Sequence, residues 1–180
     1  RIIEQGMQSE ALQILAKLSL GEDAELPVAM TLYQRGWHQG VIGILASRIK
    51  DRLHRPTIAF ADGDEGEIKG SARSIPGIHI RDILDAVATR HPGLIRRFGG
   101  HAMAAGLTLA REAHDDFAEA FVLEVARHAR DVNLQAIIES DGELNLEDFE
   151  LNLATELRFA GPWGQHFPEP VFDGRFSIVS

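Results

Sequence analysis

The segment Phe98–Gly106 holds the residue types best suited to chemistry beside a bound molecule. It contains three glycines, three alanines and one histidine within nine residues. Glycine carries no Cβ atom, so its backbone can approach another molecule closely, and a neighbouring histidine can hydrogen-bond to that molecule. We therefore expect a loop pressed against a ligand. Its contacting residues are predicted to be Gly99, Gly100, His101 and Gly106.

A second segment, Gly70–Ser74, combines two hydroxyl groups with one guanidinium group. These groups suit a phosphate oxygen or a carboxylate. If the segment is a strand, its period of two places Ser71 and Arg73 on one face and Ser74 on the other. All three are candidate ligand contacts. The alternative is an edge strand with a surface arginine.

The third segment, Trp37–Gly40, precedes an expected helix. A helix begins with backbone N–H groups that have no partner within the helix, which favours phosphate binding. His38 can add a hydrogen bond, and Trp37 can offer a stacking face to a base. Arg48 adds positive charge further along the helix. The alternative is a buried tryptophan and a histidine that caps a turn.

The sequence offers several anion-binding candidates but no catalytic centre. Asp62 and Asp64 begin like a calcium loop, but the glycine comes one position early and the later glutamate is missing, which favours a hairpin turn. No acidic cluster suits two catalytic metal ions. We expect any chemistry to be completed by a partner domain.

Charge is distributed unevenly along the 180 residues, whose net charge is −9. Residues 31–109 hold eleven Lys and Arg against seven acidic residues, a balance of +4, which leaves −13 for the remainder. The middle of the chain is therefore predicted to meet an anion, although solvated faces alone could give this asymmetry. The chain has no cysteine, which fits a reducing compartment and a cytoplasmic location. It has no apolar run long enough for a membrane span.

The order of elements predicts an α/β fold with a small mixed sheet and flanking helices. The expected strands are 28–33, 57–61, 67–74 and 104–109, and the expected helices are 4–20, 40–54, 80–90 and 112–130. Beyond residue 132 a strand at 134–138, a helix at 146–159 and a ribbon at 171–179 suggest the beginning of a β-rich domain. We thus divide the chain into a connecting helix and linker (1–27), an α/β domain (28–131) and the start of a second domain (132–180). The opening at Arg1 and the stop at Ser180 suggest a piece of a longer protein.

Three of these segments, in this order, resemble one family. Gly36–Arg48, Gly70–Ser74 and Gly99–Gly106 are similar to motifs of the DHH-associated domain of the DHH phosphoesterase superfamily. The version here is most similar to the RecJ family of single-strand-specific DNA exonucleases. Leu157–Phe172 resembles the segment that leads into that family's OB-fold domain, so the second domain is expected to be OB-like.

The resemblance implies hydrolysis of single-stranded DNA from the 5′ end, with release of mononucleotides. It also implies Mn²⁺ or Mg²⁺ held by a DHH catalytic domain of the same polypeptide, so the chain alone is expected to bind no metal and to be inactive. On this interpretation, His101 contacts the phosphate in the transition state. The substrate-binding residues are then Trp37, His38, Arg48, Ser71, Arg73, Ser74, Gly99, Gly100 and Gly106. The alternative is a stand-alone phosphate- or RNA-binding module, or half of a small-nucleotide phosphoesterase.

Overall fold

The fold is that of a computed structural model, which describes Gly6, residues 26–164, residues 167–175 and Ser177. By internal contacts the chain divides into two units, residues 1–136 and 137–180. The predicted helix at 4–20 lies outside the described residues, apart from Gly6. No helix in the described ranges is both long enough and apolar enough to cross a membrane.

The first unit is built on a five-stranded mixed sheet in the order β1-β2-β3-β5-β4. The strands are β1 (Met30–Tyr33), β2 (Thr57–Asp62), β3 (Glu67–Arg73), β4 (Arg97–Gly100) and β5 (Ala104–Ala110). β1 and β2 are parallel and are joined through a helix, whereas all other pairs are antiparallel. This confirms the predicted mixed α/β fold.

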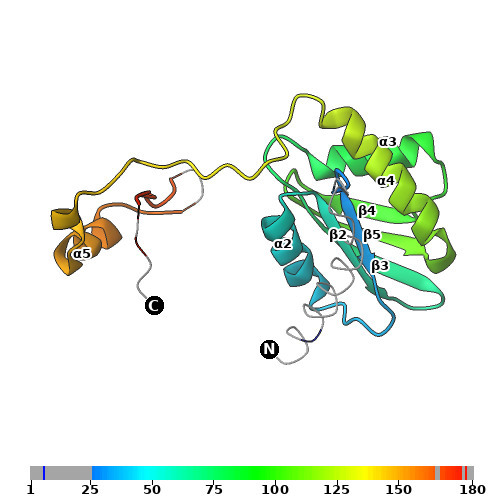
Figure 1. The fold of residues 1–180 in the computed structure, drawn as a ribbon. Coiled ribbons are helices and arrows are strands. Elements are labelled where there is room, and N and C mark those ends of the chain that lie inside the picture. The colour runs from blue at the N-terminus through cyan, green and yellow to red at the C-terminus, as the bar shows by residue number, and fades with distance from the viewer. Residues whose placement is uncertain (1–5, 7–25, 165–166, 176, 178–180) are drawn as a thin grey trace. The chain divides into compact units, whose positions relative to one another are not determined.

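Three helices cover the sheet in two layers (Figure 1). Helix α2 (Ile42–Leu53) lies on one face, and α3 (Ile80–Arg90) and α4 (His114–His128) lie on the other. Each helix carries apolar residues at helical spacing, and these residues are buried. A short 3₁₀ turn, Arg111–Ala113, leads into α4.

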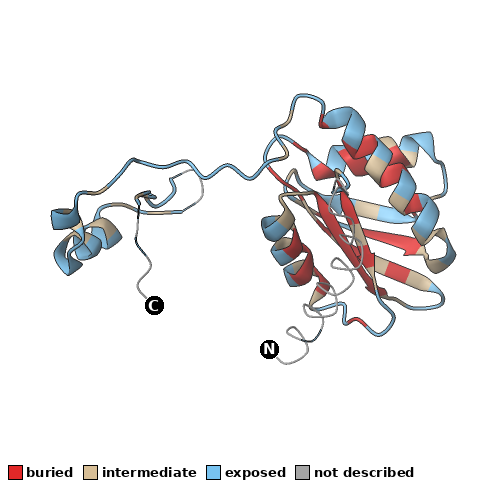
Figure 2. Ribbon diagram, viewed as in Figure 1, coloured by how far each residue is buried: buried red, intermediate tan, exposed pale blue. Residues whose placement is uncertain are grey.

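Alternation along the strands produces two separate cores (Figure 2). On β2, Ile58 and Phe60 join the core beneath α3 and α4, whereas Ala59 and Ala61 join the core beneath α2. The larger core contains Phe117, whose ring packs edge-on against Phe60 at a centroid distance of 5.7 Å. The sheet is therefore fixed from both sides where helices cover it.

One predicted loop is a strand. Residues 97–100 form β4, which pairs with β5 from Arg97↔Thr108 to Gly100↔Ala105, so the glycine run is a β-hairpin. Glycine has low β-propensity, but pairing with a strand already in the sheet compensates for it. This part of the secondary-structure prediction was wrong.

In the second unit, the helix predicted at 146–159 is present as a 3₁₀ turn, Leu146–Asp148, followed by α5 (Leu151–Phe159). The strand predicted at 134–138 is absent, because the segment is largely exposed and has no ladder partner within the described residues. In the described part of the predicted ribbon at 171–179, Asp173 forms a β-bridge with Glu143, and the Val171 carbonyl oxygen accepts from the Asp141 N–H at 2.7 Å.

Candidate nucleic-acid interface

Three of the predicted site residues form one row across the sheet. Ser71 on β3 is opposite Gly106 on β5, and Gly106 is opposite Gly99 on β4. Directly opposed residues project to the same face. Their chain neighbours Ala72 and Ala105 belong to the core beneath α3 and α4, so the row faces the other way. We call Ser71, Gly106 and Gly99 the glycine row.

Space is open above the two glycines of this row. A Cβ atom added at Gly99 would meet no heavy atom within 4 Å, and one added at Gly106 would meet only the Gly70 carbonyl oxygen, at 3.9 Å. Both residues are exposed. Packing within the described protein therefore does not require glycine at either position. A bare strip of backbone suits the close approach of another molecule.

Arg73 lies beside Ser71 on the same face, as the period of two predicted. Its Nη1 atom donates to the Ser71 Oγ atom at 3.0 Å and to the Ala72 carbonyl oxygen at 2.8 Å. Both side chains are half-buried. The guanidinium group is thereby oriented by the strand that carries it.

The first turn of α2 approaches this pair. A Cβ atom at Gly43 would lie 2.9 Å from Arg73 Nη2 and 3.2 Å from Ser71 Oγ. Val41, the N-cap residue, provides no side-chain hydrogen bond to the turn. A hydroxyl, a guanidinium and the positive end of a helix dipole thus converge, and all three favour an anion.

His101 follows β4 in a turn that is tied to the rest of the domain. Its backbone N–H donates to the Ala104 carbonyl oxygen at 2.8 Å. The next two carbonyl groups, of Ala102 and Met103, accept from the N–H groups of Ile80 and Ser74 at 2.8 and 3.0 Å. The imidazole itself is exposed. The turn therefore presents His101 at a fixed backbone position beside the glycine row.

Gly100 has a structural role in this hairpin. Its φ is +146°, and a Cβ atom there would lie 2.4 Å from the Ala104 carbonyl oxygen and 2.5 Å from the Ala105 Cα atom. No side chain fits in that space. Backbone conformation and packing therefore explain why glycine stands at position 100, whereas they do not explain the glycine at position 99.

Two predicted contact residues, Trp37 and Ser74, are buried in this structure. Trp37 is 4% exposed, within the core beneath α2, so its ring offers no face to a base. Ser74 is 1% exposed, and its hydroxyl donates to the Ile78 carbonyl oxygen at 2.6 Å. The alternative of a buried tryptophan therefore describes the 37–40 segment better.

The remaining two predicted contacts are exposed. The His38 Nδ1 atom accepts from the Gly40 N–H at 3.0 Å, so this histidine caps the turn before α2. Arg48 lies on α2, the helix whose first turn meets Arg73. Their positions make His38 and Arg48 peripheral candidates, while Ser71, Arg73 and His101 remain central.

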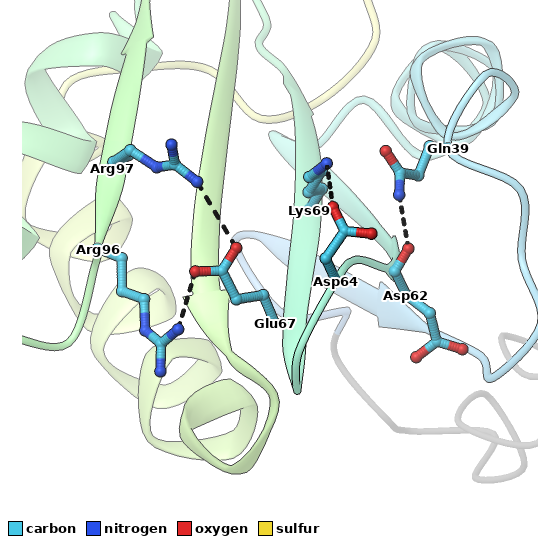
Figure 3. A network of polar contacts seen from close by, with 7 residues as sticks. All are labelled: Gln39, Asp62, Asp64, Glu67, Lys69, Arg96 and Arg97. Atoms are coloured by element: carbon cyan, nitrogen blue, oxygen red, sulfur yellow. Dashed lines mark hydrogen bonds and ion pairs between the residues drawn. The ribbon is translucent and has the colours of Figure 1, made fainter.

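The role of Asp62 was not predicted from the sequence. Its carboxylate accepts from the Tyr33 hydroxyl at 2.7 Å and from the Gly36 N–H at 3.1 Å, and it pairs with Arg111 at 3.0 Å. The Gln39 side chain donates to the Asp62 carbonyl oxygen at 2.8 Å (Figure 3). Asp62 thus anchors the loop that leads into α2. The sequence did contain one indication of this role, because Asp62 places a carboxylate directly after an apolar strand.

These contacts shift two pKa values. The hydrogen bond from Tyr33, and then the one from the Gly36 N–H, lower the pKa of Asp62. Burial, followed by the hydrogen bond to Asp62, raises the pKa of Tyr33. Both shifts keep the carboxylate charged and the phenol protonated at neutral pH.

The donor set of the site does not suit a metal ion. Within residues 26–164 and 167–175, no three His, Asp or Glu side chains are grouped closely enough to hold one. The central side chains are a hydroxyl, a guanidinium and an imidazole. These donate to phosphate oxygens, whereas a two-metal centre needs carboxylate bridges and ligands.

Two known family models match this chain. The DHHA1 domain model matches residues 25–128, and the RecJ OB domain model matches residues 140–180. The chain therefore belongs to the DHHA1 domain family, in the form that is joined to a RecJ OB domain. The resemblance predicted from the motifs is confirmed.

Several similar proteins carry the name of an exonuclease. The chain is 51% identical to the single-stranded-DNA-specific exonuclease RecJ of Dickeya dadantii, over 99% of this chain and 31% of the relative. It is 50% identical to the Escherichia coli protein of that name, over 98% of this chain and 30% of the relative. Residues 1–180 thus span about a third of the length of these relatives.

The fold agrees with solved structures of the same group. RecJ from Thermus thermophilus in complex with Mn²⁺ superposes with a TM-score of 0.67 at 28% identity, over 94% of this chain and 24% of that chain. Its complex with Mg²⁺ gives a TM-score of 0.64.

Proposed function

We propose that this chain is the substrate-binding part of a metal-dependent exonuclease that degrades single-stranded DNA from the 5′ end and releases 5′-mononucleotides. The observation that carries the proposal is the glycine row, where two glycines lie under open space close to the hydrogen-bonded pair Ser71 and Arg73. The family membership and the names of the similar proteins support it. A role in DNA repair and recombination in the cytoplasm follows from the same resemblance.

In this proposal each central residue has a defined task. Ser71 and Arg73 hold a phosphate of the strand through charge-assisted hydrogen bonds. The backbone of Gly99 and Gly106 lets the strand lie close to the sheet. His101 donates a hydrogen bond to the scissile phosphate, where charge changes during hydrolysis.

The divalent metal is assigned to a DHH domain of the same polypeptide. When bound, Mn²⁺ or Mg²⁺ activates water and stabilises charge on the phosphate. Because the described residues do not fit such a centre, we derive no step through it. We further assign residues 28–131 to the DHH-associated domain and 132–180 to the start of the OB-like domain. An Asp-His-His motif encoded upstream of Arg1 would separate this proposal from a stand-alone phosphate- or RNA-binding module.

The central experiment compares His101→Ala with Arg73→Ala in the full-length protein. Loss of one transition-state donor typically lowers kcat by about 10²–10³-fold, so His101→Ala should lower kcat by that factor with little change in KM. Arg73→Ala should also raise KM, because a guanidinium holds phosphate in the ground state as well. Steady-state kinetics on single-stranded DNA measures both effects.

His91→Ala is the matched control, because this exposed histidine follows α3 on the opposite layer. It should leave kcat and KM unchanged. Thermal unfolding of all three variants tests for structural effects. Wild-type kcat in His101→Ala would contradict its catalytic role, and a lowered melting temperature with intact activity would indicate a purely structural one.

A further inference from the structure

A second row of side chains crosses the open face beside the glycine row. Lys69 on β3 is opposite Thr108 on β5, and Thr108 is opposite Arg97 on β4. The two rows are two residues apart along each strand, a separation of about 6.6–6.8 Å. Lys69, Thr108 and Arg97 therefore face the same side as Ser71.

These residues line a shallow depression of about 330 Å³. Its lining also includes Gly106 of the glycine row. Among the helices of residues 26–164, none covers this part of the sheet, since α2 packs over β1 and β2 while α3 and α4 lie on the opposite face. The depression is thus continuous with the glycine row.

The two cations in the depression are held loosely. Arg97 is 73% exposed and lies 3.6 Å from the Glu67 carboxylate, which reaches across β5 (Figure 3). Glu67 has a closer partner, Arg96, at 2.8 Å, so it stays paired if Arg97 moves away. Exposed ion pairs contribute little to stability, and Arg97 can therefore exchange its carboxylate for another anion.

Lys69 is in a similar situation. Its Nζ atom lies 3.6 Å from Asp64, a turn carboxylate that is 89% exposed. Thr108, by contrast, is buried between the two cations and forms the base of the row. A phosphate oxygen that entered the depression would meet two positive groups at its rim.

We propose that Lys69 and Arg97 bind a second phosphate of the single strand, one nucleotide step from the phosphate at Ser71 and Arg73. This inference rests on the proposed function and extends it, because it gives the strand a direction across the sheet, from one row to the next. Until DNA binds, Arg97 lies beside the Glu67 carboxylate and Lys69 beside the Asp64 carboxylate.

The test is the dependence of kcat/KM on substrate length. The double variant Lys69→Gln/Arg97→Gln is compared with wild type, in the full-length protein, on 5′-phosphorylated oligonucleotides of two to eight nucleotides. With its internucleotide phosphate at Ser71 and Arg73, a dinucleotide has no phosphate on the 3′ side to reach the second row, so both proteins should cleave it equally. Longer substrates should be cleaved about tenfold less well by the variant, the effect of one charge-assisted contact.

A salt titration gives an independent measure. Each phosphate contact to a single strand contributes about 0.7 to the slope of log K against log salt concentration, so the variant should lose about that amount. Arg81→Gln removes one exposed charge from α3, on the opposite layer, and should change neither measurement.

The outcomes separate the two claims. If the wild-type protein cleaves single-stranded DNA and the double variant loses kcat/KM equally at every length, the second phosphate site alone is overturned. The same conclusion follows if the double variant loses no kcat/KM at any length. A wild-type protein that cleaves no single-stranded DNA of any length would overturn the proposed function, and this inference with it.

Discussion

The two faces of the sheet differ most where β3, β5 and β4 lie side by side. Towards α3 and α4 these strands present Ile68, Ala72, Leu107 and Leu109, all of them buried. Towards the other side they present Ser71 and Arg73 together with Gly106 and Gly99, which are half-buried or exposed (Figure 2). The same backbone thus has one face specialised for stability and another left accessible.

Glycines show the difference most clearly. A Cβ atom at Gly70 would lie 2.5 Å from the Phe60 ring, and one at Gly100 would meet the backbone of β5. Those two glycines are needed for packing. At Gly99 and Gly106, on the open side, nothing in the described protein requires the missing Cβ. Where packing within the domain does not require glycine, its presence indicates contact with a molecule outside the domain.

The largest expected effect on stability comes from Gly100→Ala. The added Cβ would overlap the Ala104 carbonyl group at an unfavourable φ, so we expect a loss of about 2–4 kcal/mol in the free energy of unfolding. Gly99→Ala should change this free energy by less than about 1 kcal/mol, but lower kcat/KM on single-stranded DNA by about 10- to 100-fold. Urea denaturation and steady-state kinetics measure the two quantities.

The proposed difference between the two faces is wrong if Gly100→Ala and Gly99→Ala have the same effects on stability and activity. Gly99→Ala with full activity would mean that the open strip is not used by substrate. A large loss of stability in Gly99→Ala would mean that the strip is covered by another part of the full-length protein.

A smaller effect on stability is expected from changing Asp62, which lies at the end of β2. Asp62 connects Tyr33 and Arg111 to the loop before α2. Asp62→Asn should lower the free energy of unfolding by about 1–2 kcal/mol at pH 7. Asp64→Asn is the control, because this carboxylate in the same turn is 89% exposed.

The effect of Asp62→Asn should depend on pH. The pKa of Asp62 is lowered in the folded state, so its contribution is complete above the ordinary value of 3.8 and is lost as the pH falls through the folded pKa. The difference between wild type and variant should therefore shrink as the pH is lowered below about 4. A difference that stays constant from pH 7 to pH 3 would show that the charge of Asp62 is not what stabilises the loop.

The smallest expected effect compares two serines on opposite faces. Ser74→Ala removes a buried hydrogen bond to Ile78 and should lower the free energy of unfolding by about 1 kcal/mol, with kinetics unchanged. Ser71→Ala should leave stability within about 0.5 kcal/mol and raise KM for single-stranded DNA. If Ser74→Ala alone altered KM, the assignment of these two residues to opposite faces would be wrong.

Local pattern was sufficient for much of this protein. Apolar residues every three or four positions predicted α2, α3 and α4, and the predicted strands of the first domain lie where β1, β2, β3 and β5 were found. The period of two placed Ser71 and Arg73 on one face and Ser74 on the other, because side-chain direction in a strand is a local property. Motif order also predicted the family.

What depended on tertiary structure was which residues meet. Strand β4 was not predictable from local sequence, because a strand of Arg, Phe and two glycines exists only through its pairing with β5. The glycine row follows from that register, and so does the distinction between Gly99 and Gly100. Burial of Trp37 likewise depends on how α2 packs on β1 and β2. Composition gives residue types, but long-range pairing decides which side chains share a face, and a binding site is made of such neighbours.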